Sequence, residues 1–203
     1  MRIRIVFEKL GWFTFVNHVD LPIIFSRAAR RAGLSQEFTQ GFSPHPHISL
    51  GPPLAIGVVG LDEPAEFWFN DWDANSFEKW NEKLPEGLKI LKYAEVEGTS
   101  LAKLATAALY RISSVKSPLG AEALAVLEEE VGRTGELFSS SLLDGEISLV
   151  VGDLEHCGAG NLVRSLKEKG IVDGWPDVRL VRERVGTWDP FTKEILPLVG
   201  CEV

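Results

Sequence analysis

The chain has 203 residues, a formal net charge of −8, and 45% hydrophobic against 25% charged residues. These proportions are typical of globular proteins and exclude a long disordered chain. No apolar run approaches the roughly 20 residues that span a bilayer, so we expect no membrane partner. The first ten residues lack the apolar core and cleavage site of a signal peptide, which predicts a cytoplasmic protein.

The charge is unevenly distributed along the chain. Residues 1–50 carry six Lys/Arg against three Asp/Glu, whereas residues 51–100 carry four against ten. The acidic total opposes nonspecific binding to nucleic acid, because the phosphate backbone attracts basic proteins. The first 50 residues are therefore the place to look for an anion site.

Six main elements are expected in residues 1–97. Ile3, Ile5 and Phe7 alternate with polar residues, which is typical of a half-buried strand. A helix is predicted at about 21–32, since Asp20 is a good N-cap and Gly33 suits a left-handed stop. The other four elements are a strand within 47–58, a strand at 65–70, a helix that begins at Asp73 or Asn75 and ends before Pro85, and a strand at 88–96. A turn is expected at 61–64, between the second and third strands.

Residues 97–107 are small and weakly patterned, so we interpret them as a linker. Beyond them we expect a strand at 108–115, a helix at 121–131, strands at 137–143 and 146–151, a helix at 161–169 and a strand at 178–186. Asp144-Gly145 is a strong signal for a two-residue hairpin. The tail from Trp188 to Val203 has no assignment.

Both halves have the element order βαββαβ. This order is that of the ferredoxin-like arrangement, in which two helices cover one face of a sheet. We therefore predict an α+β fold of two tandem ferredoxin-like subdomains, residues 1–97 and 107–203. A single sheet running unbroken through both halves would count against that division.

Three arginines, Arg27, Arg30 and Arg31, share one face of the helix predicted at 21–32. A solvated helix face is the ordinary explanation, but three guanidinium groups also make a site for phosphate or carboxylate. We expect them to reach solvent. The opposite stripe is apolar and should be buried: Leu21, Ile24, Phe25, Ala28 and Ala32.

The segment Ser43-Pro44-His45-Pro46-His47 should be extended, because proline fixes its own φ and restricts the residue before it. We expect His45 and His47 to point roughly the same way. Gly41 and Phe42 would supply a left-handed turn and a core anchor. The candidate binding residues are Arg27, Arg30, Arg31, Gly41, Phe42, His45 and His47.

A metal site is a second hypothesis for the same region. His18, Asp20, His45 and His47 would converge if both segments lie at one sheet edge, and imidazole with carboxylate suits Zn, Fe, Ni or Mn. The alternative is that Asp20 only caps the helix and His18 binds a nearby carbonyl. We assign no cofactor.

Four motifs carry a family resemblance: N-H-V-D-L, R-A-A-R-R-A-G-L, T-Q-G-F-S-P-H-P-H-I-S-L and P-L-A-I-G. They resemble S-H-L-D-L, R-A-L-R-R-A, Y-S-x-G-F-N-P-H-P-K-I-S and P-L-P-x-G of the bacterial radical-SAM-linked family DUF2344. The resemblance is dense over residues 15–66 and faint beyond. The family usually has lysine where this chain has His47, which weighs against His47 as an obligatory metal ligand.

The resemblance implies a noncatalytic accessory module that works with a B12-binding radical-SAM protein and presents or binds its substrate. Only Cys157 and Cys201 are present, and a radical-SAM enzyme needs three cysteines for its cluster, so this chain is not itself that enzyme. Two alternatives stay open. One is an RNA-binding or RNA-processing protein, and the other is a small His/Asp metalloenzyme.

Overall fold

The computed structural model describes residues 1–200; residues 201–203, which include Cys201, lie outside that part. Residues 1–97 hold β1 (Arg2–Lys9), the short 3-10 turns η1 (Gly11–Phe15) and η2 (His18–Asp20), α1 (Leu21–Arg31), β2 (Ile48–Leu50), β3 (Val59–Trp68), α2 (Ser76–Asn81) and β4 (Leu88–Glu95). The later elements are α3 (Leu101–Leu104), β5 (Ala107–Ser114), α4 (Ala121–Thr134), β6 (Glu136–Leu143), β7 (Glu146–Gly152), α5 (Ala159–Glu168), η3 (Trp175–Asp177), β8 (Val178–Asp189) and β9 (Glu194–Pro197). The fold is α+β. None of the helices in residues 1–200 has the length and the apolar composition of a membrane-spanning segment.

The strands of the described residues form one mixed sheet in the order β4-β1-β3-β8-β5-β7-β6, with β2 beside β3 and β9 beside β8. The two halves meet where β3 and β8 run parallel, and only Val59 with Val181 and Gly60 with Arg182 are paired there. All other strand pairs are antiparallel. This continuity counts against two separate sheets, and the division at 97–107 stays a prediction.

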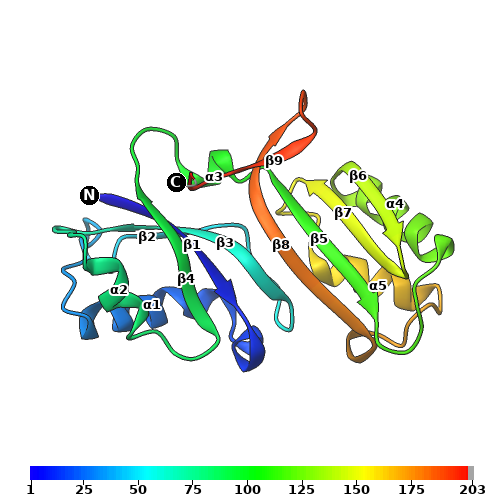
Figure 1. Cartoon of the computed structure of the whole chain (residues 1–203), viewed down its shortest axis with the longest axis horizontal. Coiled ribbons are helices and arrows are strands. Elements are labelled where there is room, and N and C mark those ends of the chain that lie inside the picture. The colour runs from blue at the N-terminus through cyan, green and yellow to red at the C-terminus, as the bar shows by residue number, and fades with distance from the viewer. Residues whose placement is uncertain (201–203) are drawn as a thin grey trace.

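The buried apolar side chains nevertheless gather in two clusters. One joins β1, α1, β3, α2 and β4 around Phe25, Phe67 and Trp80. The other joins the strands and helices of the second half and takes in Leu54 and Val58 from the first. Figure 1 shows α1 and α2 against the strands of the first half and α4 and α5 against those of the second. The narrow junction between β3 and β8 therefore connects two hydrophobic cores.

The helix predicted at 21–32 is α1, which ends one residue earlier, at Arg31. Leu21, Phe25 and Ala28 are buried as expected, whereas Ile24 and Ala32, also expected to be buried, are half-buried. All three arginines of the opposite stripe are exposed. Gly33 ends the helix with φ +78°, a conformation that costs glycine little because it has no Cβ.

One local prediction is wrong. The turn expected at 61–64 is the middle of β3. On one side of β3 the neighbouring strand changes from β8 to β2, and Pro64 lies at this change. Its missing N–H faces that side, so the proline interrupts no regular strand pairing. Gly51 N–H still donates to the Pro64 carbonyl on that side, over 2.9 Å. The linker expected at 97–107 contains the short helix α3, whose Leu101 is fully buried.

The hairpin at Asp144-Gly145 is confirmed, with φ +51° and +79° at the two turn residues. The tail that had no assignment extends β8 and then forms β9. After β9 the chain crosses back to the first half, as Figure 1 shows. There the Leu198 carbonyl accepts a hydrogen bond from the buried Arg4, 3.2 Å away, which ties the end of the described chain to β1.

Candidate functional site

A groove of about 530 Å³ lies between α1 and the segment that leads into β2. Helix α1 contributes one wall, and the proline-rich segment contributes the other. The groove is lined by Pro22, Ile23, Ser26, Arg27, Arg30, His45, Pro46 and Ile48. The structure thus brings together three of the predicted binding residues, Arg27, Arg30 and His45.

The two arginines of the groove are available to a ligand. Arg27 and Arg30 are exposed on α1, and neither guanidinium group has a hydrogen bond or ion pair with any other described residue. A guanidinium group offers several donors in a rigid fork, which suits carboxylate and phosphate oxygens. No aspartate or glutamate is among the groove residues that the structure describes. The groove is therefore a basic site in an acidic protein.

Ser26 adds an unsatisfied group at this wall. The residue is 8% exposed, and its hydroxyl has no hydrogen-bond partner in the described part of the chain. Buried hydroxyls in folded proteins nearly always have a partner, so each exception needs a physical explanation. The oxygen has essentially no exposed surface in this rotamer, so a bound molecule supplies the partner only if the hydroxyl rotates toward the groove.

His45 is held in the second wall by its own loop. Its backbone N–H donates to Thr39 Oγ1 over 3.2 Å, and its carbonyl accepts from Thr39 N–H over 2.8 Å. Pro46 follows directly and fixes the backbone further. The ring of His45 stays exposed.

Four predicted residues lie outside the lining of this groove. Arg31 turns away and donates to the Lys83 carbonyl over 2.7 Å. His47 does not point with His45, because its ring stacks on Trp68 at 3.8 Å and its Nδ1 lies 3.5 Å from Glu37 Oε1. Gly41 has the expected positive φ of +135°. Phe42 is fully exposed, so the prediction of a core anchor there is wrong.

The metal hypothesis gains no support from the geometry. Among residues 1–200 no three His, Cys, Asp or Glu side chains lie where they would hold one metal ion, so His18, Asp20, His45 and His47 do not converge. Asp20 is the N-cap by position but makes no side-chain capping bond. His18 Nδ1 accepts the Leu54 N–H over 3.5 Å, and the ring also makes the expected backbone hydrogen bond, to Gly51.

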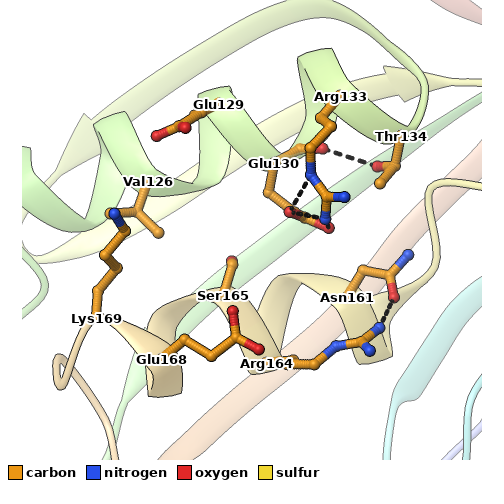
Figure 2. A pocket seen from close by; sticks show the side chains of 10 residues that line it. All are labelled: Val126, Glu129, Glu130, Arg133, Thr134, Asn161, Arg164, Ser165, Glu168 and Lys169. Atoms are coloured by element: carbon orange, nitrogen blue, oxygen red, sulfur yellow. Dashed lines mark hydrogen bonds and ion pairs between the residues drawn. The ribbon is translucent and has the colours of Figure 1, made fainter.

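A second groove, of about 560 Å³, lies between α4 and α5 (Figure 2). Its arginines are already bonded inside the groove: Arg133 pairs with Glu130 at 2.7 Å, and Arg164 donates to Asn161. Glu129 and Glu168 also line it. This groove is therefore a poorer anion site than the one beside α1.

The family profile described as an uncharacterized protein conserved in bacteria (DUF2344) matches residues 2–137, more than half of the chain. The chain belongs to the DUF2344 family. The match extends well past the 15–66 segment in which the motifs are dense, and it includes both walls of the groove.

Two further comparisons concern curated proteins and solved structures. No curated protein matches this DUF2344 chain. Among solved structures it is similar to the ligand-free regulatory subunit of aspartate kinase from Thermus thermophilus, with 14% identity and a TM-score of 0.27, over 82% of this chain and 89% of that one. A score this low carries no argument about function.

The DUF2344 chain also contains a buried polar cluster at the junction of its halves. Arg182 of β8 and Glu63 of β3 form an ion pair at 2.5 Å, with side chains 1% and 3% exposed. Arg182 also donates to the carbonyls of Pro52 and Pro53 and to the Tyr110 hydroxyl. This cluster was not predictable from the sequence, because its two charges are 119 positions apart.

Lys9 lies beside this cluster and is fully buried. Its Nζ donates to the Val16 carbonyl over 2.7 Å. Burial lowers the pKa of Lys9, and the nearby Glu63 carboxylate acts in the opposite direction. The junction is therefore a buried polar core in which one carboxylate, Glu63, lies near two basic side chains, Arg182 and Lys9.

The position of His18 near the same cluster predicts a pH dependence. Burial, with a smaller contribution from Arg182, lowers the pKa of His18 below 6.5. As the pH falls below about 6.5, the unfolded chain binds a proton at His18 before the folded chain does, so the free energy of unfolding decreases. His18→Asn should flatten that decrease in urea unfolding measured across about pH 5 to 7.

His156 gives a control of opposite sign. A hydrogen bond from its ring to Asp153 raises the pKa of His156, so this group stabilises the fold at low pH and loses that effect as the pH rises through its folded pKa. His156→Asn should therefore remove stability at acidic pH. If the free energy of unfolding changes with pH equally in His18→Asn and in the parent, the assignment of this pH dependence to His18 is wrong.

Proposed function

We propose that this DUF2344 chain is a noncatalytic binding module that holds an anionic group in the groove beside α1. The observation that carries the proposal is the meeting of Arg27, Arg30 and His45 in one groove without a carboxylate among its described lining residues. Because neither arginine has a partner of its own, an incoming phosphate or carboxylate does not have to break an existing ion pair.

The proposal includes a partner. Membership of DUF2344 and the motif resemblance support an accessory role beside a cytoplasmic B12-binding radical-SAM protein, whose substrate or surface would supply the anionic group. Of the two other hypotheses, RNA binding is opposed by the net charge of −8, and the metalloenzyme lacks a ligand cluster within residues 1–200.

The proposal also treats each half as a ferredoxin-like unit. The strand orders β4-β1-β3-β2 and β8-β5-β7-β6, all antiparallel, support this assignment, since they correspond position by position in the two halves. In both units the two helices follow the first and third strands. The arrangement carries no functional argument by itself, because this fold hosts many unrelated functions.

Charge reversal tests the groove. Arg27→Glu together with Arg30→Glu should weaken binding of inorganic phosphate and of the radical-SAM partner at least tenfold, measured by calorimetry and by co-elution on gel filtration. The midpoint of thermal unfolding should change little, since exposed charges contribute about 1 kcal/mol or less to folding.

Arg31 provides the matched control on the same helix. Its guanidinium contacts the Lys83 carbonyl outside the groove lining, so Arg31→Glu should leave phosphate and partner binding unchanged. If the double variant binds both as tightly as the parent, the functional face lies elsewhere. If it unfolds, the two arginines are structural.

A further inference from the structure

We propose that the groove beside α1 binds a small amphiphilic monoanion, a molecule in which one carboxylate is attached to an apolar body. The inference rests on the proposed anion site and names the class of ligand that fills the rest of the groove. It follows from the walls, the charged rim and the unpartnered hydroxyl taken together.

The walls of the groove are apolar. Pro22 and Ile23 on α1 face the space opposite Pro46 and Ile48, and Ile23 is 52% exposed in the free protein. An inorganic anion bound at the arginines would leave these four side chains in water. An apolar body on the same ligand would cover them, which is favourable in proportion to the area removed from water.

The polar side chains that α1 contributes to the groove are few and lie close together on the helix. Ser26, Arg27 and Arg30 lie within five residues of α1, so they fall on one or two successive turns beside the apolar pair. The Ser26 hydroxyl lacks a partner and its oxygen has essentially no exposed surface, so it donates to a carboxylate held by the arginines once it rotates toward the groove. One carboxylate would thus satisfy the three groups that the protein leaves open.

The size and rigidity also suit a small molecule. A volume of about 530 Å³ falls within the range of small-molecule sites, which combine apolar walls with a few polar groups that fix orientation. Pro22 and Pro46 stiffen the two walls, so little ordering is needed on binding. No Trp, Tyr or Phe lines the described groove, so His45 is the one aromatic ring among its described residues on which a nucleic-acid base would stack.

Calorimetry of the full chain with butyrate, hexanoate and octanoate tests the inference. Affinity should rise with chain length, by up to about fourfold for each methylene group that the walls bury. Octanoate should bind more tightly than inorganic phosphate, and neutral 1-hexanol more weakly than hexanoate. Arg27→Gln and Arg30→Gln should each weaken octanoate binding about tenfold, and Arg179→Gln, an exposed arginine on β8, should not.

Ser26→Ala distinguishes a ligand contact from a packing role. The change should weaken octanoate binding several-fold, yet leave the free protein at least as stable as the parent, because it deletes a buried hydroxyl that has no partner. Unchanged octanoate affinity in this variant would contradict the placement of the carboxylate.

The failures of the two proposals are distinguishable. If phosphate binds through Arg27 and Arg30 but octanoate binds no more tightly than butyrate, the amphiphile is wrong and the anion site stands. If neither phosphate nor octanoate binds, or if both bind the arginine variants as well as the parent, both proposals fail.

Discussion

Glu63→Gln should lower the free energy of unfolding by about 3–5 kcal/mol, because it leaves a buried guanidinium without its counter-charge. Arg182 is fully buried and cannot release its proton at any ordinary pH. Its remaining partners, the Tyr110 hydroxyl and two backbone carbonyls, are neutral. The residue pair also lies where β3 meets β8, so the loss should weaken the junction between the two cores.

Two controls separate this effect from ordinary surface charge. Arg111 and Glu183 pair at 2.9 Å between β5 and β8 with side chains 44% and 22% exposed, and Glu183→Gln should cost about 1 kcal/mol or less. Adding Arg182→Met to Glu63→Gln should recover part of the loss, since the buried guanidinium is then removed and Lys9 is the one basic group of the cluster that remains. Denaturant unfolding measures all three. A loss for Glu63→Gln as small as that for Glu183→Gln would show that the junction does not depend on the pair.

Elements that carry their signals locally were predictable from the sequence. Helix α1 has its N-cap position, its apolar stripe and its glycine stop within fourteen residues, and the hairpin at Asp144-Gly145 needs only two residues in the left-handed region. The order of strands and helices in each half followed from such signals. Their ends were less well defined, because α2 stops at Asn81, before the proline that was expected to end it.

The junction was not predictable in this way. A proline after Asp62 and Glu63 is a common turn signal, yet here the strand continues, because the ion pair with Arg182 and the change of partner strand accommodate it. Arg182, the ion-pair partner of Glu63, belongs to β8 and lies 119 positions further along the chain. Hydrophobic periodicity contains no information about such a contact.

Only part of the candidate site was predictable, because contacts with distant residues orient some of its side chains. Helical spacing correctly placed Arg27 and Arg30 on one face, and the prolines correctly marked the opposite wall. Helical spacing alone was insufficient for Arg31, because a long side chain at the last turn of α1 reaches the free Lys83 carbonyl beyond α2. His47 was misplaced because stacking on Trp68, a residue of β3, determines its orientation.

Trp80→Ala should destabilise the protein by about 3–5 kcal/mol, since it empties the centre of the first core. The indole is fully buried, its ring lies 4.8 Å from that of Phe67 and 5.8 Å from that of Phe25, and its Nε1 donates to the Phe25 carbonyl over 3.2 Å. Phe25 belongs to α1, so the tryptophan fastens the helix that forms one wall of the groove.

Trp80→Phe is the matched variant, because it keeps an aromatic ring and removes the indole N–H. It should lose on the order of 1–2 kcal/mol, most of it from the Phe25 carbonyl left without that donor and from the smaller ring. Denaturant unfolding gives both values, and phosphate titration of the still-folded Phe variant reports on the groove. A loss for Trp80→Ala no greater than that for Trp80→Phe would mean that the surrounding aromatic rings close over the cavity, and that the position of α1 does not depend on this side chain.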